Sequence, residues 1–211
     1  MKIDFRLEEK KDYRLVEEVT REAFWNVFTP RCDDHLLVHN LRKRKEFIPE
    51  LDFVAMHNGK IIGNIVYVNA KIQGNDGKEY SVVAFGPVSV LPEYQDKGVG
   101  SKLINHTIKL AKEMGYRAIL IYGYPDYYKR FGFKESKAYK ITNKDGKYPA
   151  AFLILELFPD ALNGIEGIYD EGDIYKTDAE ELGIFDKGFA EKEKKVTKTQ
   201  ERFLGMVNKF L

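Results

Sequence analysis

The segment from Val88 to Ser101 constrains the fold more than any other part of the 211-residue sequence. An apolar run typical of a strand is followed by a short loop with glycine at positions 98 and 100, and a helix begins at once. Such a unit points several unpaired backbone N–H groups at one place, beside the positive end of the helix dipole. The glycines also remove the Cβ atoms that would keep a ligand off the backbone. The segment therefore predicts an α/β fold with a site for a phosphate or pyrophosphate.

Two familiar phosphate-binding loops do not fit this segment. Leu103 stands where the dinucleotide-binding fingerprint has its third glycine, and no Gly-Lys-Ser/Thr follows, as a nucleoside-triphosphate loop requires. A Gly-x-Gly pair alone is equally compatible with a tight strand-to-helix turn. The preceding Gly86 and Pro87 add information, because proline cannot donate a ladder hydrogen bond and glycine weakens strand pairing. We expect a bulge or a splay there, which leaves backbone groups free.

Hydrophobic periodicity predicts an alternation of strands and helices around this segment. Asn58-Gly59 between two apolar runs is a strong signal for a β-hairpin. The predicted strands are 2–7, 52–57, 60–72, 80–90, 118–122 and 151–157, and the predicted helices are 12–27, 33–43 and 101–114.

The charge balance limits the class of partner. With 34 Lys and Arg against 33 Asp and Glu, the net charge is +1, unlike that of a protein that binds nucleic acid non-specifically. The apolar run from Val82 to Pro92 is much shorter than the roughly 20 residues of a membrane-spanning helix. We therefore expect no nucleic-acid partner and no membrane partner. Because Cys32 is the single cysteine and residues 1–6 lack the pattern of a signal peptide, we expect a cytoplasmic protein.

Two motifs together carry a resemblance to a known family. Residues 95–100 match the pattern Gln/Arg-x-x-Gly-x-Gly/Ala, and residues 128–133 match Tyr-x-x-x-Gly-Phe. In this order and context, the sequence resembles the GCN5-related N-acetyltransferase (GNAT) superfamily. The stretch Pro-x-Tyr-Tyr-x-Arg-Phe-Gly-Phe at 125–133 is similar to an uncharacterised bacterial branch of that superfamily.

The resemblance implies a three-layer α/β (α+β) fold, in which a central mixed, mostly antiparallel sheet has helices on both faces. It also implies transfer of the acetyl group of acetyl-coenzyme A (acetyl-CoA) to a primary amine of a small molecule or peptide, by direct attack in a ternary complex and without a metal. Tyr128 would be the general acid toward the departing thiolate, since a phenol is protonated at neutral pH. The implied cofactor-binding residues are Val88, Ser89, Val90, Gln95, Asp96, Lys97, Gly98, Val99, Gly100 and Ser101.

The sequence assigns no general base. Many members of the family carry a glutamate on the strand that splays, whereas residues 85–89 contain no carboxylate. A water chain, an acid of the N-terminal helices and an acid of the C-terminal segment are the alternatives. The missing carboxylate also leaves a rival function, a non-catalytic sensor that binds coenzyme A or a nucleotide phosphate at the same loop. The presence of Tyr128 at the expected spacing favours the enzyme.

Several other polar residues allow both a functional and a structural interpretation. Cys32 and His35 could form a nucleophilic pair, but a lone thiol is more often inert. His35 and His39, four residues apart, could share a metal, but no third ligand is evident, so we expect an exposed helix face. The basic run at residues 42–45 is expected to be a solvated helix end, and His106 to face solvent or the coenzyme.

The composition changes near residue 157. Residues 1–157 contain the elements of the GNAT resemblance and form the predicted acyltransferase domain. Residues 158–211 carry 12 acidic and 8 basic side chains and form a predicted, mostly irregular appendage. Apolar residues at helical spacing from Phe203 onward predict docking onto the domain or onto a partner in a homodimer. The acids between residues 170 and 181 either line a pocket for a cationic amine or form a solvated loop.

Overall fold

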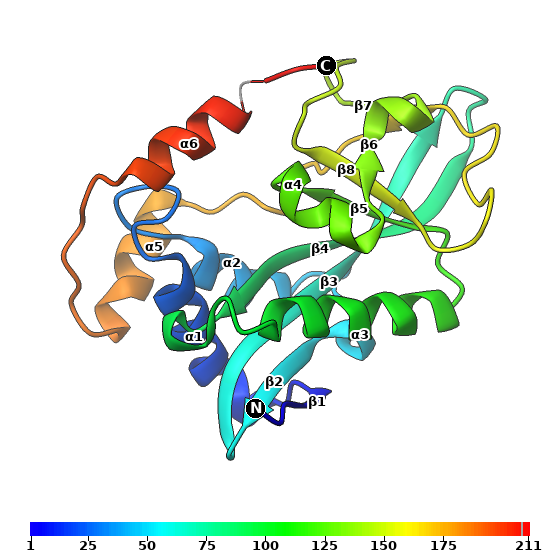
Figure 1. Ribbon diagram of the computed structural model, residues 1–211. Coiled ribbons are helices and arrows are strands. Elements are labelled where there is room, and N and C mark those ends of the chain that lie inside the picture. The colour runs from blue at the N-terminus through cyan, green and yellow to red at the C-terminus, as the bar shows by residue number, and fades with distance from the viewer. Residues whose placement is uncertain (208) are drawn as a thin grey trace.

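The computed structural model of the chain describes residues 1–207 and 209–211, without the side chain of Val207. Its centre is a nine-stranded sheet, in which seven strands follow the order β1-β2-β3-β4-β5-β8-β6 (Figure 1). The remaining strands β7 and β9 pair with each other, and β9 also pairs with β3. The strands are β1 (Asp4–Leu7), β2 (Phe53–His57), β3 (Lys60–Gly74), β4 (Glu79–Val90), β5 (Ala118–Tyr122), β6 (Lys134–Glu135), β7 (Ile141–Asn143), β8 (Phe152–Glu156) and β9 (Gly167–Tyr169).

Helices lie on both faces of this sheet. They are α1 (Tyr13–Phe24), α2 (Asp34–Leu41), α3 (Val99–Glu113), α4 (Pro125–Tyr128), α5 (Ala179–Phe185) and α6 (Lys198–Val207). Asn64 and Tyr67 are three residues apart in β3, so their side chains point to opposite faces. Asn64 accepts a hydrogen bond from Thr20 of α1 at 3.2 Å, and Tyr67 bonds to Thr107 of α3 at 3.0 Å. The α1 and α3 helices therefore cover opposite faces, as Figure 1 shows.

The pairing of the strands confirms the predicted mixed, mostly antiparallel sheet. The β4–β5 and β7–β9 pairs are parallel, and the other pairs are antiparallel within the described residues. The predicted hairpin connects β2 to β3, with Asn58 at φ 49° and Gly59 at φ 78°. Two consecutive left-handed residues are the geometry that an Asn-Gly hairpin turn requires. None of the described helices has the length and apolar character needed to cross a membrane.

The C-terminal segment contributes to the sheet and covers α1. Strand β9 lies beyond the predicted boundary at residue 157, yet it pairs with β3 and β7. Further on, Asp186 accepts a hydrogen bond from Arg21 at 3.1 Å, and the Glu193 carbonyl accepts one from Trp25 at 2.9 Å. The division of the chain into 1–157 and 158–211 stays a prediction.

The final apolar stripe is only partly covered. The ring of Phe203 lies 4.6 Å from that of Phe28, in the loop after α1. By contrast, Leu204 is 56% exposed, and Phe210 and Leu211 are also exposed. The predicted docking therefore applies to Phe203 through its side chain and to residues 209–211 through their main chain, which pairs with residues 148–150. The side chain of Val207 lies outside the described residues.

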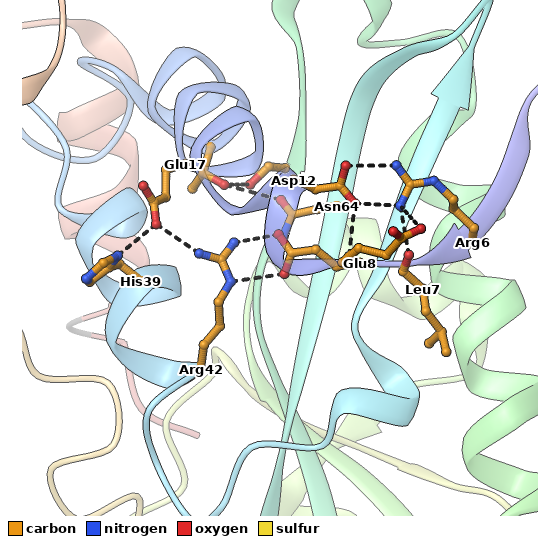
Figure 2. Close-up of polar contacts among 11 residues, drawn as sticks. Arg6, Leu7, Glu8, Asp12, Glu17, His39, Arg42 and Asn64 are labelled. Atoms are coloured by element: carbon orange, nitrogen blue, oxygen red, sulfur yellow. Dashed lines mark hydrogen bonds and ion pairs between the residues drawn. The ribbon is translucent and has the colours of Figure 1, made fainter.

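A buried ion-pair network contradicts the prediction of a solvated basic run at Arg42, whereas Lys43 and Lys45 are exposed as predicted. The guanidinium of Arg42 donates to both carboxylate oxygens of Glu8, at 3.0 and 2.6 Å, and to Glu17 at 2.9 Å (Figure 2). The Arg42 side chain is 3% exposed and that of Glu8 is fully buried. The prediction was wrong because the acids that neutralise Arg42 come from the strand β1 end and from α1, far away in the sequence.

The prediction of an exposed helix face was wrong for His35, whereas the side chain of His39 is 33% exposed. His35 is fully buried, and its Nε2 lies 3.0 Å from Asp186 of the C-terminal segment. His39 bonds to Glu17 at 2.8 Å, so each imidazole faces a carboxylate instead of the other imidazole. His106 stacks on Phe5, with ring centroids 5.1 Å apart, and packs edge-on against Phe53. Its ring therefore packs between aromatic side chains and does not face the predicted anion loop.

Candidate functional site

The site begins where β4 leaves its neighbour β5. The two strands pair only at Val83 with Ile119 and at Ala84 with Leu120, and beyond this point they splay. On the opposite edge, β4 has one residue more than β3 between its paired positions Phe85 and Val88. The bulge predicted at Gly86-Pro87 is thereby confirmed.

The splayed part of β4 presents backbone groups to the gap. The Leu91 N–H donates to Ile62 O of β3 at 2.9 Å, and in an antiparallel ladder alternate residues face the same neighbour. The N–H and C=O groups of Val88 and Val90 therefore point away from β3, toward the gap. The side chain of Gln95 already donates to Val90 O at 2.9 Å. Strand β4 thus offers the peptide groups that an extended ligand could bind.

The loop after β4 carries unpaired amides as predicted. The Gln95 N–H donates to Pro92 O at 3.2 Å, whereas the amides of residues 96–101 have no backbone acceptor within the described part of the chain. Gly98 precedes α3 with a left-handed φ of 78°, which brings the loop directly into the first helical turn. Six consecutive amides at a helix N-terminus suit a pyrophosphate.

Gly100 has a different role from Gly98. A Cβ atom at Gly98 would meet no atom within 4 Å, whereas one at Gly100 would lie 3.3 Å from the hydroxyl of Tyr127 and 3.5 Å from Val90 Cγ2. Gly98 is therefore needed for its backbone conformation, whereas a side chain at Gly100 would crowd the cavity between Tyr127 and Val90.

These elements enclose a cavity of about 400 Å³. Nine of the eleven residues predicted for the site line this cavity. They are Val88, Val90, Gln95, Asp96, Gly98, Val99, Gly100, Ser101 and Tyr128.

Two predicted residues point elsewhere. The hydroxyl of Ser89 is fully buried and donates to Thr20 of α1 at 3.0 Å, so it fastens the helix to the sheet. The Lys97 ammonium turns back to the carbonyl of Glu93 at 2.6 Å. At these two positions only the main chain is available to the site.

Tyr128 stands at the inner end of the cavity. Its ring packs against Phe85 of β4 and Phe133, with centroids 5.9 and 5.6 Å away. A Cβ atom at Gly123 would overlap the ring, at 2.3 Å from Tyr128 Cε2, so a glycine is required after β5. Burial raises the pKa of the Tyr128 hydroxyl well above its ordinary value of 10, and the group is a proton donor at neutral pH.

Several wall residues of the cavity were not predicted from the sequence. Ala23 and Phe24 come from the end of α1, which no motif marks. Arg130 lines the cavity, and its guanidinium lies 4.7 Å from the Tyr127 ring centroid, which places a positive charge beside the anion loop. The motif around Tyr128 contains Arg130, so its spacing was the signal that could have identified it.

Cys32 does not provide a nucleophile at this site. Its thiol is 2% exposed and lies 3.5 Å from His35 Nδ1. Burial raises the pKa of this thiol far above its ordinary value of 9.0, which disfavours the reactive thiolate. Among the residues described, no group of three or more His, Cys, Asp and Glu side chains is arranged to hold a metal ion.

Comparison with known proteins agrees with this geometry. The family model described as "Acetyltransferase (GNAT) domain" matches residues 4–136. The uncharacterised N-acetyltransferase YjhQ of Escherichia coli K12 is 32% identical over 153 residues, which cover 72% of this chain and 77% of YjhQ. YhbS of the same strain, also an uncharacterised N-acetyltransferase, is 30% identical over 135 residues, which cover 64% of this chain and 78% of YhbS.

Solved structures show the same architecture. The crystal structure of Escherichia coli YhbS in complex with CoA superposes with a TM-score of 0.73 at 25% identity, covering 83% of this chain and 92% of that chain. A GNAT acetyltransferase from Brucella melitensis in complex with acetyl-CoA gives a TM-score of 0.66 at 28% identity, covering 83% of this chain and 99% of that chain.

Proposed function

The chain belongs to the GNAT acetyltransferase family, and from this premise we propose that it transfers the acetyl group of acetyl-CoA to a primary amine by direct attack in a ternary complex. The observation that carries the proposal is the row of unpaired amides at residues 96–101, which opens into the cavity that Tyr128 also lines. The two structures of relatives that contain CoA or acetyl-CoA support the same choice of co-substrate.

The cavity and the splayed strand fit the chemical parts of acetyl-CoA in sequence. The amides of residues 96–101 would hold the pyrophosphate, with Arg130 as a nearby positive charge. The free peptide groups of Val88 and Val90 would bind the amide groups of the pantetheine arm as an added strand does. This arrangement would place the thioester near the bulge at Gly86 and the hydroxyl of Tyr128.

Tyr128 would give its proton to the departing thiolate, while the amine nitrogen forms a bond to the acetyl carbon and the C–S bond breaks. Backbone N–H groups of the splayed β4 would polarise the thioester carbonyl. The burial of Cys32 supports direct transfer over an acyl-enzyme route. The acceptor would be a small-molecule or peptide amine.

The rival function, a non-catalytic sensor of coenzyme A, would use the same amides without turnover. A panel of primary amines, including aliphatic amines, arylethylamines, amino acids and short peptides, would be incubated with the protein and acetyl-CoA. If the protein is the enzyme, we expect release of the coenzyme thiol and a mass gain of about 42 Da on one acceptor. This gain corresponds to an acetyl group that replaces one hydrogen of the amine. Tight binding of acetyl-CoA by calorimetry, with no thiol release from any amine, would favour the sensor.

A further inference from the structure

A C-terminal segment, residues 170–178, covers the bulge of β4 on the α2 face of the sheet. Gly86 faces α2, since a Cβ atom there would lie 3.1 Å from Leu41 Cδ1. The same position is 3.6 Å from Cε1 of Tyr175, so this ring packs directly on the bulge. The covering segment therefore meets β4 where the proposed thioester would lie.

Strand β9 and contacts with the two ends of α2 hold this segment in place. Strand β9 fixes its beginning, and Gly172, at φ 60°, donates to the carboxylate of Asp170 in a tight turn. Asp173 accepts a hydrogen bond from Arg44 at 2.6 Å, and Thr177 donates to Asp33 at 2.5 Å. The turn is thus anchored to both ends of α2.

Two polar groups in this anchored segment lack partners. The Tyr175 hydroxyl is buried and has no hydrogen-bond partner in the described part of the chain. The partly buried carboxylate of Glu171 has neither an ion pair nor a side-chain hydrogen bond among residues 1–207 and 209–211. A buried polar group without a partner is costly, and such groups concentrate where a ligand completes the bonding.

Three tyrosines lie within electrostatic range of Glu171, and two of them belong to a stack of aromatic rings. The rings of Tyr122 and Phe152 stack with centroids 5.0 Å apart, and those of Phe152 and Tyr169 with centroids 5.4 Å apart. Burial, and to a smaller extent the negative charge of Glu171, raise the pKa of the Tyr175 hydroxyl. The charge of Glu171 also raises the pKa of the Tyr122 and Tyr169 hydroxyls. The carboxylate therefore lies within electrostatic range of all three tyrosines.

The charged groups near Glu171 leave its carboxylate largely uncompensated. Burial and, to a smaller extent, the neighbouring Asp170 raise the pKa of this carboxyl from its ordinary value of 4.5 to about 7. Lys144 lowers this pKa, but its effect is smaller than that of burial or of Asp170. An ammonium group would supply the missing positive charge and would also be attracted by the faces of the tyrosine rings.

We propose that Glu171 binds the ammonium group of the acceptor and accepts its proton, and that Tyr122 and Tyr175 form the walls of this part of the site. The inference rests on the proposed N-acetyl transfer and names the class of acceptor, a cationic primary amine. It assigns the general base to the C-terminal segment, which compensates for the absence of a carboxylate at residues 85–89.

The proton balance of the reaction is complete with these groups. Glu171 removes one proton from the ammonium, and the neutral nitrogen forms the C–N bond as the C–S bond breaks. The thiolate takes the proton of Tyr128, and the second nitrogen proton restores the phenol. The products are the N-acetylated amine and the free thiol of coenzyme A, and Glu171 releases its proton to solvent.

The test compares the parent with the variants Glu171→Gln and Glu171→Asp, using the best amine of the panel. At pH 7, Glu171→Gln should lower kcat/KM by about 10²-fold or more, the usual contribution of a general base. Its activity should increase about tenfold per pH unit up to the pKa of the free amine, since only the neutral amine then reacts. Glu171→Asp should restore part of the activity at pH 7.

Glu180→Gln is the matched control, because Glu180 is an exposed acid of α5, which follows this segment directly. It should keep the parent pH profile, and all three variants should bind acetyl-CoA within about twofold of the parent affinity, measured by calorimetry. If Glu171→Gln keeps the parent kcat/KM and pH profile, the proposal is refuted.

A second measurement judges the site without turnover. The carboxyl carbon of Glu171 would be followed by NMR in the coenzyme-bound protein, assigned by its loss in Glu171→Gln. It should titrate near pH 7, and propylammonium should lower its pKa whereas 1-propanol should not. An ordinary carboxyl pKa, or an equal response to both probes, would overturn the proposal. If the parent acetylates no amine, the proposed transfer fails, and this titration still decides whether Glu171 binds ammonium.

Discussion

Glu171→Gln should stabilise the folded protein at pH 8 relative to the parent. Burial raises the carboxyl pKa from 4.5 to about 7, so the folded state holds this proton more tightly than the unfolded chain does. The contribution of Glu171 to stability is therefore present below about pH 4.5 and is lost as the pH rises toward 7. At about 1.36 kcal/mol per pKa unit, the full loss would be about 3.4 kcal/mol. Because the side chain is partly exposed, solvent screening reduces this to about 1–2 kcal/mol.

Urea unfolding of the parent and Glu171→Gln at pH 5 and pH 8 would measure this effect. Burial also raises the pKa of Asp34 to about 7 and that of Asp52, but both groups are present in the two proteins and cancel in the difference. The stability advantage of the variant should grow by about 1 kcal/mol or more between the two pH values. Glu180→Gln should show no such growth. An advantage for Glu171→Gln that is equal at both pH values would show that the folded protein does not perturb this carboxyl.

The other predictions concern the coenzyme side and the buried charges. Gly100→Val should weaken acetyl-CoA binding by about 10-fold or more in calorimetry, because the valine side chain enters the cavity and costs at least one charge-assisted hydrogen bond. Gly98→Ala should instead lower the free energy of unfolding by about 1 kcal/mol, since φ is 78° at this position. Tyr128→Phe should reduce kcat by about 10²-fold with acetyl-CoA affinity unchanged, and an unchanged kcat would assign the acid to another group. Arg42→Met should destabilise the protein by about 3 kcal/mol or more in urea unfolding, since it leaves the buried carboxylate of Glu8 without its cation and removes one of the two partners of Glu17.

Local patterns predicted the coenzyme side of the molecule well. The strand, loop and helix around Gly98 form within one continuous stretch, so hydrophobic period and turn chemistry suffice to place them. The bulge at Gly86-Pro87 was also predictable, because the backbone limits of these two residues act locally. The motif spacing placed Tyr128 in the same cavity without any knowledge of the packing.

Predictions that depended on distant partners failed. Arg42 belongs to a run of four basic residues, and nothing nearby in the sequence indicates that Glu8 and Glu17 neutralise it in the interior. His35 is buried because Asp186, 151 residues away, meets its imidazole. In both cases, the burial of a charged or polar side chain follows from pairs that only the tertiary structure brings together.

The acids of the C-terminal segment show why composition could not choose between a pocket and a solvated loop. Asp173 pairs with Arg44, Asp178 accepts hydrogen bonds from the first amides of α5, and Glu181 bonds to Asn40. These acids stabilise the segment, and Glu171 alone among these four is partly buried without such a partner in the described chain.

The position of Glu171 also decides which experiment is informative. Truncation before Pro159 would remove Glu171 together with β9, which pairs with β3 of the central sheet. Loss of activity after truncation would therefore combine a missing proton acceptor with a damaged sheet. A glutamine at residue 171 keeps the strand, the turn and the anchors on α2, and it changes only the charge and proton affinity of one side chain. A defect confined to the pH dependence of acceptor use would then belong to this carboxylate and not to the architecture that carries it.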